Sequence, residues 1–111
     1  MIIIEALPIY KKWKEQQTKE IKNIVTDAVN KIKVGNTAKL KTLRAAIIEI
    51  KIDFGAGVRI YLTKKQENHY IALWGGADKK RQQSDIEKAI KIKQFWEANE
   101  NEKKKNNGNG F

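Results

Sequence analysis

The sequence predicts an α+β fold in which a small, largely antiparallel sheet of about four strands lies with two N-terminal helices and one C-terminal helix. Apolar residues recur every three or four positions before residue 35 and after residue 84, which is the helical period. Between residues 48 and 62 they recur at every second position, which is the period of a strand. The length of 111 residues suits one domain, placed at residues 1–98.

The N-terminal third predicts one strand and two helices. Residues 1–7 are apolar apart from Glu5 and indicate the strand. Pro8 suits the first turn of a helix, and no glycine follows before position 35. Thr18 can cap a second helix, so the segment divides there into two. The second helix carries an apolar stripe that we expect in the core: Ile21, Ile24, Val25, Ala28, Val29 and Ile32.

The middle of the chain predicts the rest of the sheet. Residues 36–45 are polar and basic without a clear period, so we expect a connecting segment. The alternation in residues 48–54 and 58–63, separated by Gly55-Ala56-Gly57, predicts a hairpin. A β-rich run at residues 69–74, stopped by two glycines, predicts the fourth strand.

The predicted hairpin turn fixes an expected register. If Phe54 and Val58 flank a three-residue turn, Asp53 lies opposite Arg59 and Lys51 lies opposite Tyr61. Lys51 and Arg59 then become diagonal neighbours on the face away from the aliphatic stripe, which we expect to be exposed to water.

The last helix is expected to begin at Ser84, which forms a capping-box pattern with Glu87. Its buried side should comprise Ile86, Ala89, Ile90, Lys93 and Trp96. Residues 99–111 are rich in Asn, Lys and Gly and have little apolar content, which predicts a disordered basic tail.

Composition limits the possible functions. The 23 basic residues against 13 acidic ones give a net charge of +10, which favours a partner rich in phosphate or carboxylate. The chain has no cysteine and one histidine, which excludes zinc fingers, iron–sulfur clusters and thiol nucleophiles. We expect no metal and no cofactor. With neither an export signal nor a long apolar run, the default compartment is the cytoplasm.

Two basic segments are candidates for binding phosphate. Lysine, arginine and tyrosine side by side on the hairpin, at positions 51, 59 and 61, could converge on a phosphodiester. The run from Lys79 to Arg81 follows a flexible glycine pair near a helix start. On alternation alone the hairpin positions favour a solvated surface, and the Lys79–Arg81 run could equally be one. His69 has no evident partner, and the three tryptophans lie in apolar periodic contexts, so we expect surface and core roles for them.

The stretch IEIKIDFGAGVRIYLTKK, followed by HYIALWGGADKKRQQSDIEKAIKI, resembles the RelE/ParE superfamily of toxins from bacterial toxin–antitoxin modules. It is most similar to the HigB-like branch of addiction module killer proteins. The matching features are a strand of the type E-L-R-I, a glycine-flanked hairpin, an apolar strand ending in Gly-Gly, an Asp-Lys loop and a D-I-x-x-A helix. The similarity is good over residues 46–93 and extends to residues 1–35 in element order alone.

This resemblance implies a type II toxin that inhibits translation as a ribosome-dependent mRNA endoribonuclease, or mRNA interferase. The chemistry it implies is metal-independent, with the 2′-hydroxyl attacking the adjacent phosphate. The implied partners are a cognate antitoxin, the ribosome and mRNA, with no membrane involved. The implied catalytic residues are Lys51, Arg59, Tyr61, Asp78, Lys79 and Arg81, and the implied RNA contacts are Lys51, Arg59, Lys64, Lys79, Lys80 and Arg81.

Several positions depart from the family pattern. Ala56 replaces a proline, Val58 replaces a tyrosine, Glu49 stands where RelE has a catalytic lysine, and Ala77 is an added residue. The last helix also lacks the catalytic tyrosine of RelE. These departures leave two alternatives open: a ParE-like inhibitor of DNA gyrase without ribonuclease activity, and a non-toxic nucleic-acid-binding module whose affinity depends steeply on salt.

Overall fold

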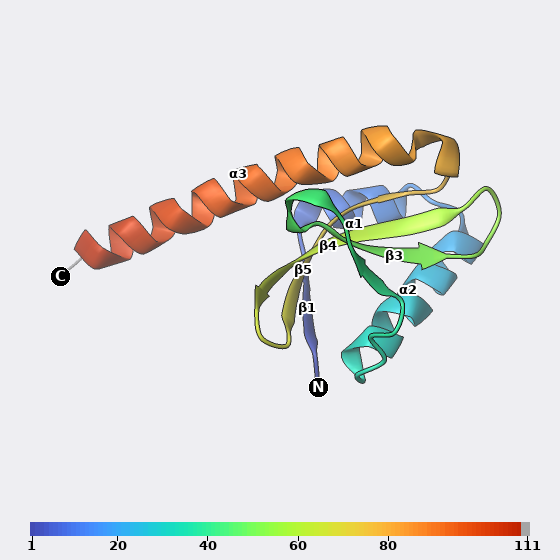
Figure 1. Cartoon of the computed structure of the whole chain (residues 1–111), viewed down its shortest axis with the longest axis horizontal. Coiled ribbons are helices and arrows are strands. Elements are labelled where there is room, and N and C mark those ends of the chain that lie inside the picture. The colour runs from blue at the N-terminus through green and yellow to red at the C-terminus, as the bar shows by residue number, and fades with distance from the viewer. Residues whose placement is uncertain (110–111) are drawn as a thin grey trace.

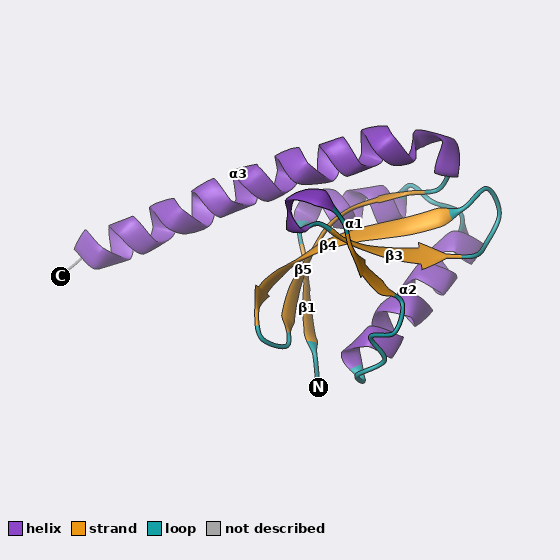
Figure 2. Cartoon of the chain, viewed as in Figure 1, coloured by secondary structure: helices purple, strands orange, loops and turns teal. Residues whose placement is uncertain are grey.

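The chain forms a five-stranded mixed sheet in the strand order β1-β5-β4-β3-β2, shown in the computed structural model of Figures 1 and 2. The structure describes residues 1–109, and side chains are described as far as residue 102. β1 pairs with β5 in parallel, and the other neighbours are antiparallel. The strands are β1 (Ile3–Ala6), β2 (Leu40–Thr42), β3 (Ile48–Ile52), β4 (Val58–Gln66) and β5 (His69–Gly76).

Helices cover both faces of this sheet. One face packs against α1 (Pro8–Glu15) and α2 (Lys19–Lys33), and the other packs against α3 (Gln82–Asn109). Figure 1 shows α3 as a long rod that continues well beyond the sheet. Two short 3₁₀ turns, η1 (Arg44–Ala46) and η2 (Lys79–Arg81), precede β3 and α3. The α+β class is therefore confirmed.

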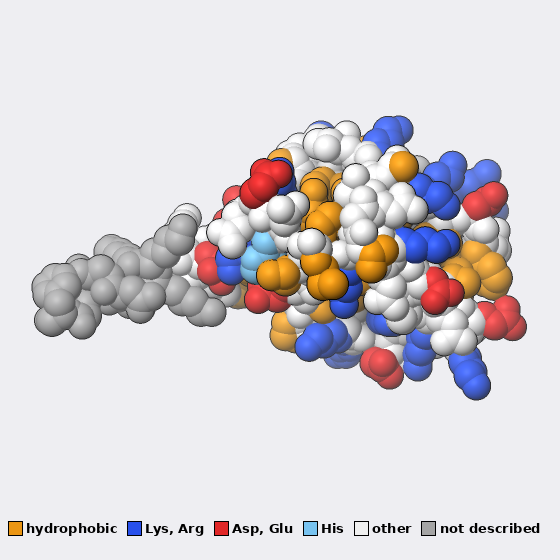
Figure 3. Space-filling view, turned by 90° about the horizontal axis from the view of Figure 1, so that it is seen from below, with side chains coloured by type: hydrophobic (Ala, Val, Ile, Leu, Met, Phe, Trp, Pro, Cys, Tyr) orange, Lys and Arg blue, Asp and Glu red, His pale blue; other side chains and the backbone are white. Residues whose placement is uncertain are grey.

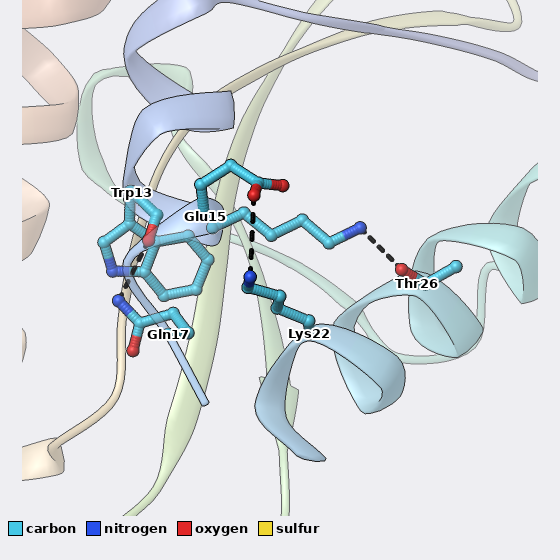
Figure 4. Close-up of polar contacts among 6 residues, drawn as sticks. Trp13, Glu15, Gln17, Lys22 and Thr26 are labelled. Carbon is cyan, nitrogen blue, oxygen red and sulfur yellow. Dashed lines mark hydrogen bonds and ion pairs between the residues drawn. The ribbon is translucent and has the colours of Figure 1, made fainter. Parts of the chain in front are cut away.

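The division of the N-terminal helical segment is also confirmed. Thr18 is the N-cap of α2, and its hydroxyl accepts a hydrogen bond from the Ile21 amide at 3.3 Å. Figure 4 shows the corner between the two helices, where Lys22 reaches back to Glu15 and Gln17 donates to the Trp13 carbonyl. The cap at Thr18 thus lies at the corner between α1 and α2.

The predicted strand count of four is wrong, because residues 36–45 contain a fifth strand. β2 pairs antiparallel with β3, with Leu40 opposite Ile50 and Thr42 opposite Ile48. This strand is three residues long, and Leu40 is its one apolar residue. A strand of three residues is too short to show an alternation of apolar and polar residues. Because it lies at the edge of the sheet and pairs on one side only, it can also be polar.

The expectation of a water-exposed hairpin face is wrong for β4, although Lys51 on β3 is exposed as expected. The aliphatic side of β4, with Val58, Ile60 and Leu62, packs towards α1 and α2. The opposite side, with Arg59, Tyr61 and Thr63, is also buried, because α3 covers it. The apolar residues of this alternation therefore face α1 and α2, and the polar residues face α3. Neither side of this part of β4 is in contact with water.

The register of the hairpin differs from the predicted one by two residues. Lys51 lies directly opposite Arg59, and Ile52 opposite Val58, so β3 ends before Asp53. The predicted cross-strand pair of Asp53 with Arg59 is therefore absent. The connection is longer because Gly55 and Gly57 both adopt positive φ, at 57° and 102°, and build a wider loop than a three-residue turn.

The last helix begins earlier than predicted. The η2 turn leads into α3 at Gln82, so Ser84 lies inside the first turn, and its hydroxyl donates to the Arg81 carbonyl. Of the expected buried side, Ile86 and Ala89 are buried, and Ile90, Lys93 and Trp96 are half-buried. The helix extends to Asn109, past the proposed boundary at residue 98, and residues 110 and 111 lie outside the described residues. The disorder of residues 99–111 stays a prediction.

The surface reflects the basic composition. In the face that Figure 3 shows, lysine and arginine side chains are spread across the surface among apolar and neutral side chains, with some carboxylates between them. No helix within residues 1–109 is long and apolar enough to cross a lipid bilayer.

Candidate functional site

A groove at the carboxyl end of β5 gathers aromatic, acidic, amide and basic side chains. It encloses about 410 Å³ between the end of α1, the β3–β4 loop and the start of α3. We call it the Asp85 groove. Its lining includes two aromatic rings, two carboxylates, amides and one guanidinium: Trp13, Gln16, Gln17, Trp74, Gly75, Gly76, Asp78, Arg81 and Asp85.

Asp85 is held in this groove by its neighbours. The Trp74 indole N–H donates to Asp85 Oδ1 at 3.4 Å. Gly76 leaves the room that the carboxylate occupies, because a Cβ on Gly76 would overlap Asp85 Oδ2. Burial raises the pKa of Asp85, and the Trp74 hydrogen bond and the nearby Arg81 charge oppose this shift only in part. A half-buried carboxyl with a raised pKa is a candidate for proton transfer.

Behind the groove lies a buried ion pair. Arg59 Nε is 3.6 Å from Glu49 Oε2, and the two side chains are 7% and 5% exposed. Glu49 also accepts a hydrogen bond of 2.9 Å from the Gln82 amide, which ties β3 to the start of α3. Arg59 Nε and Nη1 have no hydrogen-bond partner among the residues that the structure describes. Both nitrogens are themselves buried from solvent, so an anion in the groove does not reach them in this conformation.

The free side of Arg59 faces the loop that precedes β4. A Cβ on Gly57 would lie 3.0 Å from Arg59 Nη1 and 3.3 Å from the Cβ of Lys79. The Lys79 amide donates to the Ala56 carbonyl at 2.9 Å, which joins the β3–β4 loop to η2. A glycine is therefore required at position 57 for two reasons: its φ is positive, and Arg59 and Lys79 pack closely against it. The two predicted basic segments, on the hairpin and at Lys79 to Arg81, meet at this glycine.

Tyr61 is fully buried in the core under α3, near the Glu49 carboxylate. Burial raises the pKa of Tyr61, and the negative charges of Glu49 and Asp85 raise it further. A phenol in this setting stays protonated and out of reach of a substrate. The structure therefore places Tyr61 in the core, and a catalytic role for it would require the core to open.

The remaining predicted residues are spread over the molecule. Asp78 and Arg81 line the Asp85 groove, where the Asp78 carboxylate also accepts a hydrogen bond from the Lys80 amide at 2.9 Å. Lys51 is exposed on β3 directly opposite Arg59. Lys64 lies towards the other end of β4, where it forms an ion pair with Glu67 at 3.1 Å.

Two acidic residues of the site were not among the sequence-based candidates. Asp85 contributed only to the D-I-x-x-A motif, and Glu49 stood out only as a departure from the family. No sequence signal pointed to the burial of Glu49, since this residue occupies a polar position of an alternating strand, which is typical of a water-exposed face. Within residues 1–109 no group of three or more His, Cys, Asp or Glu side chains could hold a metal ion.

The comparisons with known proteins give a partial match. No family model matches the chain. An uncharacterized protein of Haemophilus influenzae is 36% identical to it over 61 residues, which are 55% of this chain and 61% of that protein. The chain thus matches less than two thirds of the length of this relative.

Proposed function

We propose that the protein is the toxin of a type II toxin–antitoxin module and cleaves messenger RNA in the ribosome at the Asp85 groove. The observation that carries the proposal is the meeting of a carboxyl of raised pKa with cations around one groove. Asp85 and Arg81 line it, and the buried Arg59 lies close enough for its charge to act on the Asp85 carboxyl.

These groups suit cleavage by the 2′-hydroxyl of the RNA itself. Asp85 takes the proton of the hydroxyl, whose oxygen forms a bond to the adjacent phosphorus. The bond from phosphorus to the 5′-oxygen breaks, and that oxygen takes a proton from the Asp85 carboxyl or from water. Arg81, with Lys79 at the rim, stabilises the extra negative charge on the phosphate. The products are a 2′,3′-cyclic phosphate and a 5′-hydroxyl.

The first test uses ribosomes that hold a defined codon in the decoding site, with the same RNA free in solution as a control. We expect a ribosome-dependent cut within that codon and a cyclic phosphate at the new end. Asp85→Asn should lower the cleavage rate by about 10² to 10⁴. Asp27→Asn, the same change at an exposed carboxylate of α2, should leave the rate unchanged.

One observation favours a second function. Tyr61 and Arg59, two of the residues expected to be catalytic, are buried, so the predicted ribonuclease set does not lie together on the surface. A ParE-like toxin needs no such set. If the protein inhibits purified DNA gyrase and leaves ribosome-bound mRNA intact, gyrase inhibition becomes the proposed function in place of mRNA cleavage.

A further inference from the structure

Lys51, which lies outside the Asp85 groove, lines a different hollow. This hollow encloses about 250 Å³ between the second half of α2, the connection from α2 to β2 and the end of β3. We call it the Lys51 hollow. It shares no lining residue with the Asp85 groove, so the two are separate sites.

Much of the lining of the Lys51 hollow is apolar. Four isoleucines from α2 and β3 line it, of which Ile32 and Ile50 are buried and Ile24 and Ile52 are half-buried. The small side chain of Ala28 lies on the same part of α2 and leaves the hollow open. Apolar surface that lines a hollow favours a ligand with an apolar body, because binding removes this surface from water.

Three lysines from three different segments also line the hollow. They are Lys31 of α2, Lys39 of the connection to β2, and Lys51 of β3, and all three are exposed. None of them forms an ion pair with any residue that the structure describes. Asp27 is the one carboxylate among the lining residues. The lining therefore has an excess of positive charge, which a bound anion would reduce.

We propose that the Lys51 hollow binds a small amphipathic anion, in which one apolar ring or branched chain carries a phosphate or carboxylate group. The apolar body packs against the four isoleucines, and the anionic group lies between the three lysines. The Asn36 amide, which also lines the hollow, adds a hydrogen-bond donor. The volume is just below the usual range for ligand pockets of about 300 to 1,000 Å³, so a small molecule fits better than a polymer.

Three related probes test the two parts of the ligand separately. 1-Naphthyl phosphate has a ring and an anionic group, 1-naphthol has the ring alone, and inorganic phosphate has the anionic group alone. We expect 1-naphthyl phosphate to bind the full chain at least about tenfold more tightly than either of the others. In ¹⁵N nuclear magnetic resonance spectra it should shift the amide signals of residues 31, 36, 39 and 51. 1-Naphthoate, with a carboxylate on the same ring, shows which anionic group the site prefers.

Substitutions in the hollow test its shape and its charge. Ala28→Leu fills the hollow without changing any charge and should weaken binding of 1-naphthyl phosphate at least about tenfold. Ala98→Leu is the matched control, because Ala98 is exposed on α3. Lys31→Ala and Lys51→Ala should each weaken binding about two- to fivefold, and together about tenfold. Lys65→Ala, at an exposed position of β4 outside the hollow, should leave binding unchanged.

Three results would overturn the proposal. The first is that 1-naphthyl phosphate binds no more tightly than 1-naphthol. The second is binding that Phe95→Ser abolishes and the Lys31→Ala, Lys51→Ala double variant leaves unchanged, because the ligand would then occupy the apolar hollow that Phe95 lines between α1 and α3. The third is single-stranded RNA that shifts the same amide signals while 1-naphthyl phosphate does not, because the lysines would then be RNA contacts. Circular dichroism shows that each variant remains folded. None of these measurements depends on cleavage at the Asp85 groove.

Discussion

Replacing Glu49 by glutamine should destabilise the fold far more than an ordinary loss of a salt bridge. Glu49 and Arg59 are each less than one tenth exposed, and their charged atoms are 3.6 Å apart. Glutamine keeps the size of the side chain and can still accept the hydrogen bond from Gln82. The substitution therefore removes the charge of Glu49 and leaves the buried guanidinium without its counter-charge.

The expected cost is about 3 kcal/mol, at the lower end of the range for breaking one side of a buried ion pair. For a chain of this length each kcal/mol lowers the melting temperature by about 4 °C, so we expect a fall of about 12 °C. Glu67→Gln is the control, because Glu67 makes an ion pair with Lys64 at 3.1 Å but is 84% exposed. Its loss should cost at most about 0.5 kcal/mol.

Urea denaturation followed by circular dichroism measures both variants against the parent chain. A loss below about 1 kcal/mol for Glu49→Gln would refute the reasoning, since the guanidinium would then not depend on Glu49. The double substitution Glu49→Leu with Arg59→Met removes both charges together. It should recover most of the stability, because two apolar side chains of similar volume carry no desolvation cost.

Three further changes have defined expectations. Gly76→Ala would place a Cβ 3.0 Å from the Asp85 Cγ, so the carboxyl should move off the Trp74 indole; unfolding assays should show a loss of about 1 to 3 kcal/mol, and cleavage should fall. The pKa of Asp85 is higher in the folded chain than in the unfolded chain, so the parent should become more stable relative to Asp85→Asn as the pH falls through the folded pKa. The stability difference should be complete below the pKa of the unfolded chain, and thermal melts from pH 7 to 3 measure this difference. Thr18→Ala should cost about 1 kcal/mol in the same melts, because it removes the N-cap of α2.

Local signals in the sequence were sufficient for the two N-terminal helices. Pro8 and Thr18 mark helix starts through their own backbone chemistry, and Gly35 adopts a φ of 102° just past the end of α2. These effects depend on neighbours within one turn, so the sequence alone can predict them. The start of α3 was misplaced because Ser84 is a good capping residue that the η2 turn, formed just before it, leaves inside the helix.

The parts of the sheet that depend on distant residues could not be predicted in the same way. A hairpin register depends on the loop geometry, and the two glycines of positive φ moved it by two residues. The burial of Arg59 depends on α3, whose packing no pattern within the hairpin reveals. The groove was missed for a related reason: Asp85 faces Gly76 and Trp74 only because α3 returns across the end of β5.

The parallel pairing of β1 with β5 determines when the molecule can complete its fold during synthesis. Ile3 pairs with His69, so the first strand to leave the ribosome has no partner until most of the chain has followed. Long-range pairings of this kind form late, because closing the intervening loop costs entropy first. The Asp85 groove also combines Trp13 with residues of α3, so a nascent chain lacks it. Any activity at this groove is then withheld from a truncated product and arises only when translation of the domain is nearly finished.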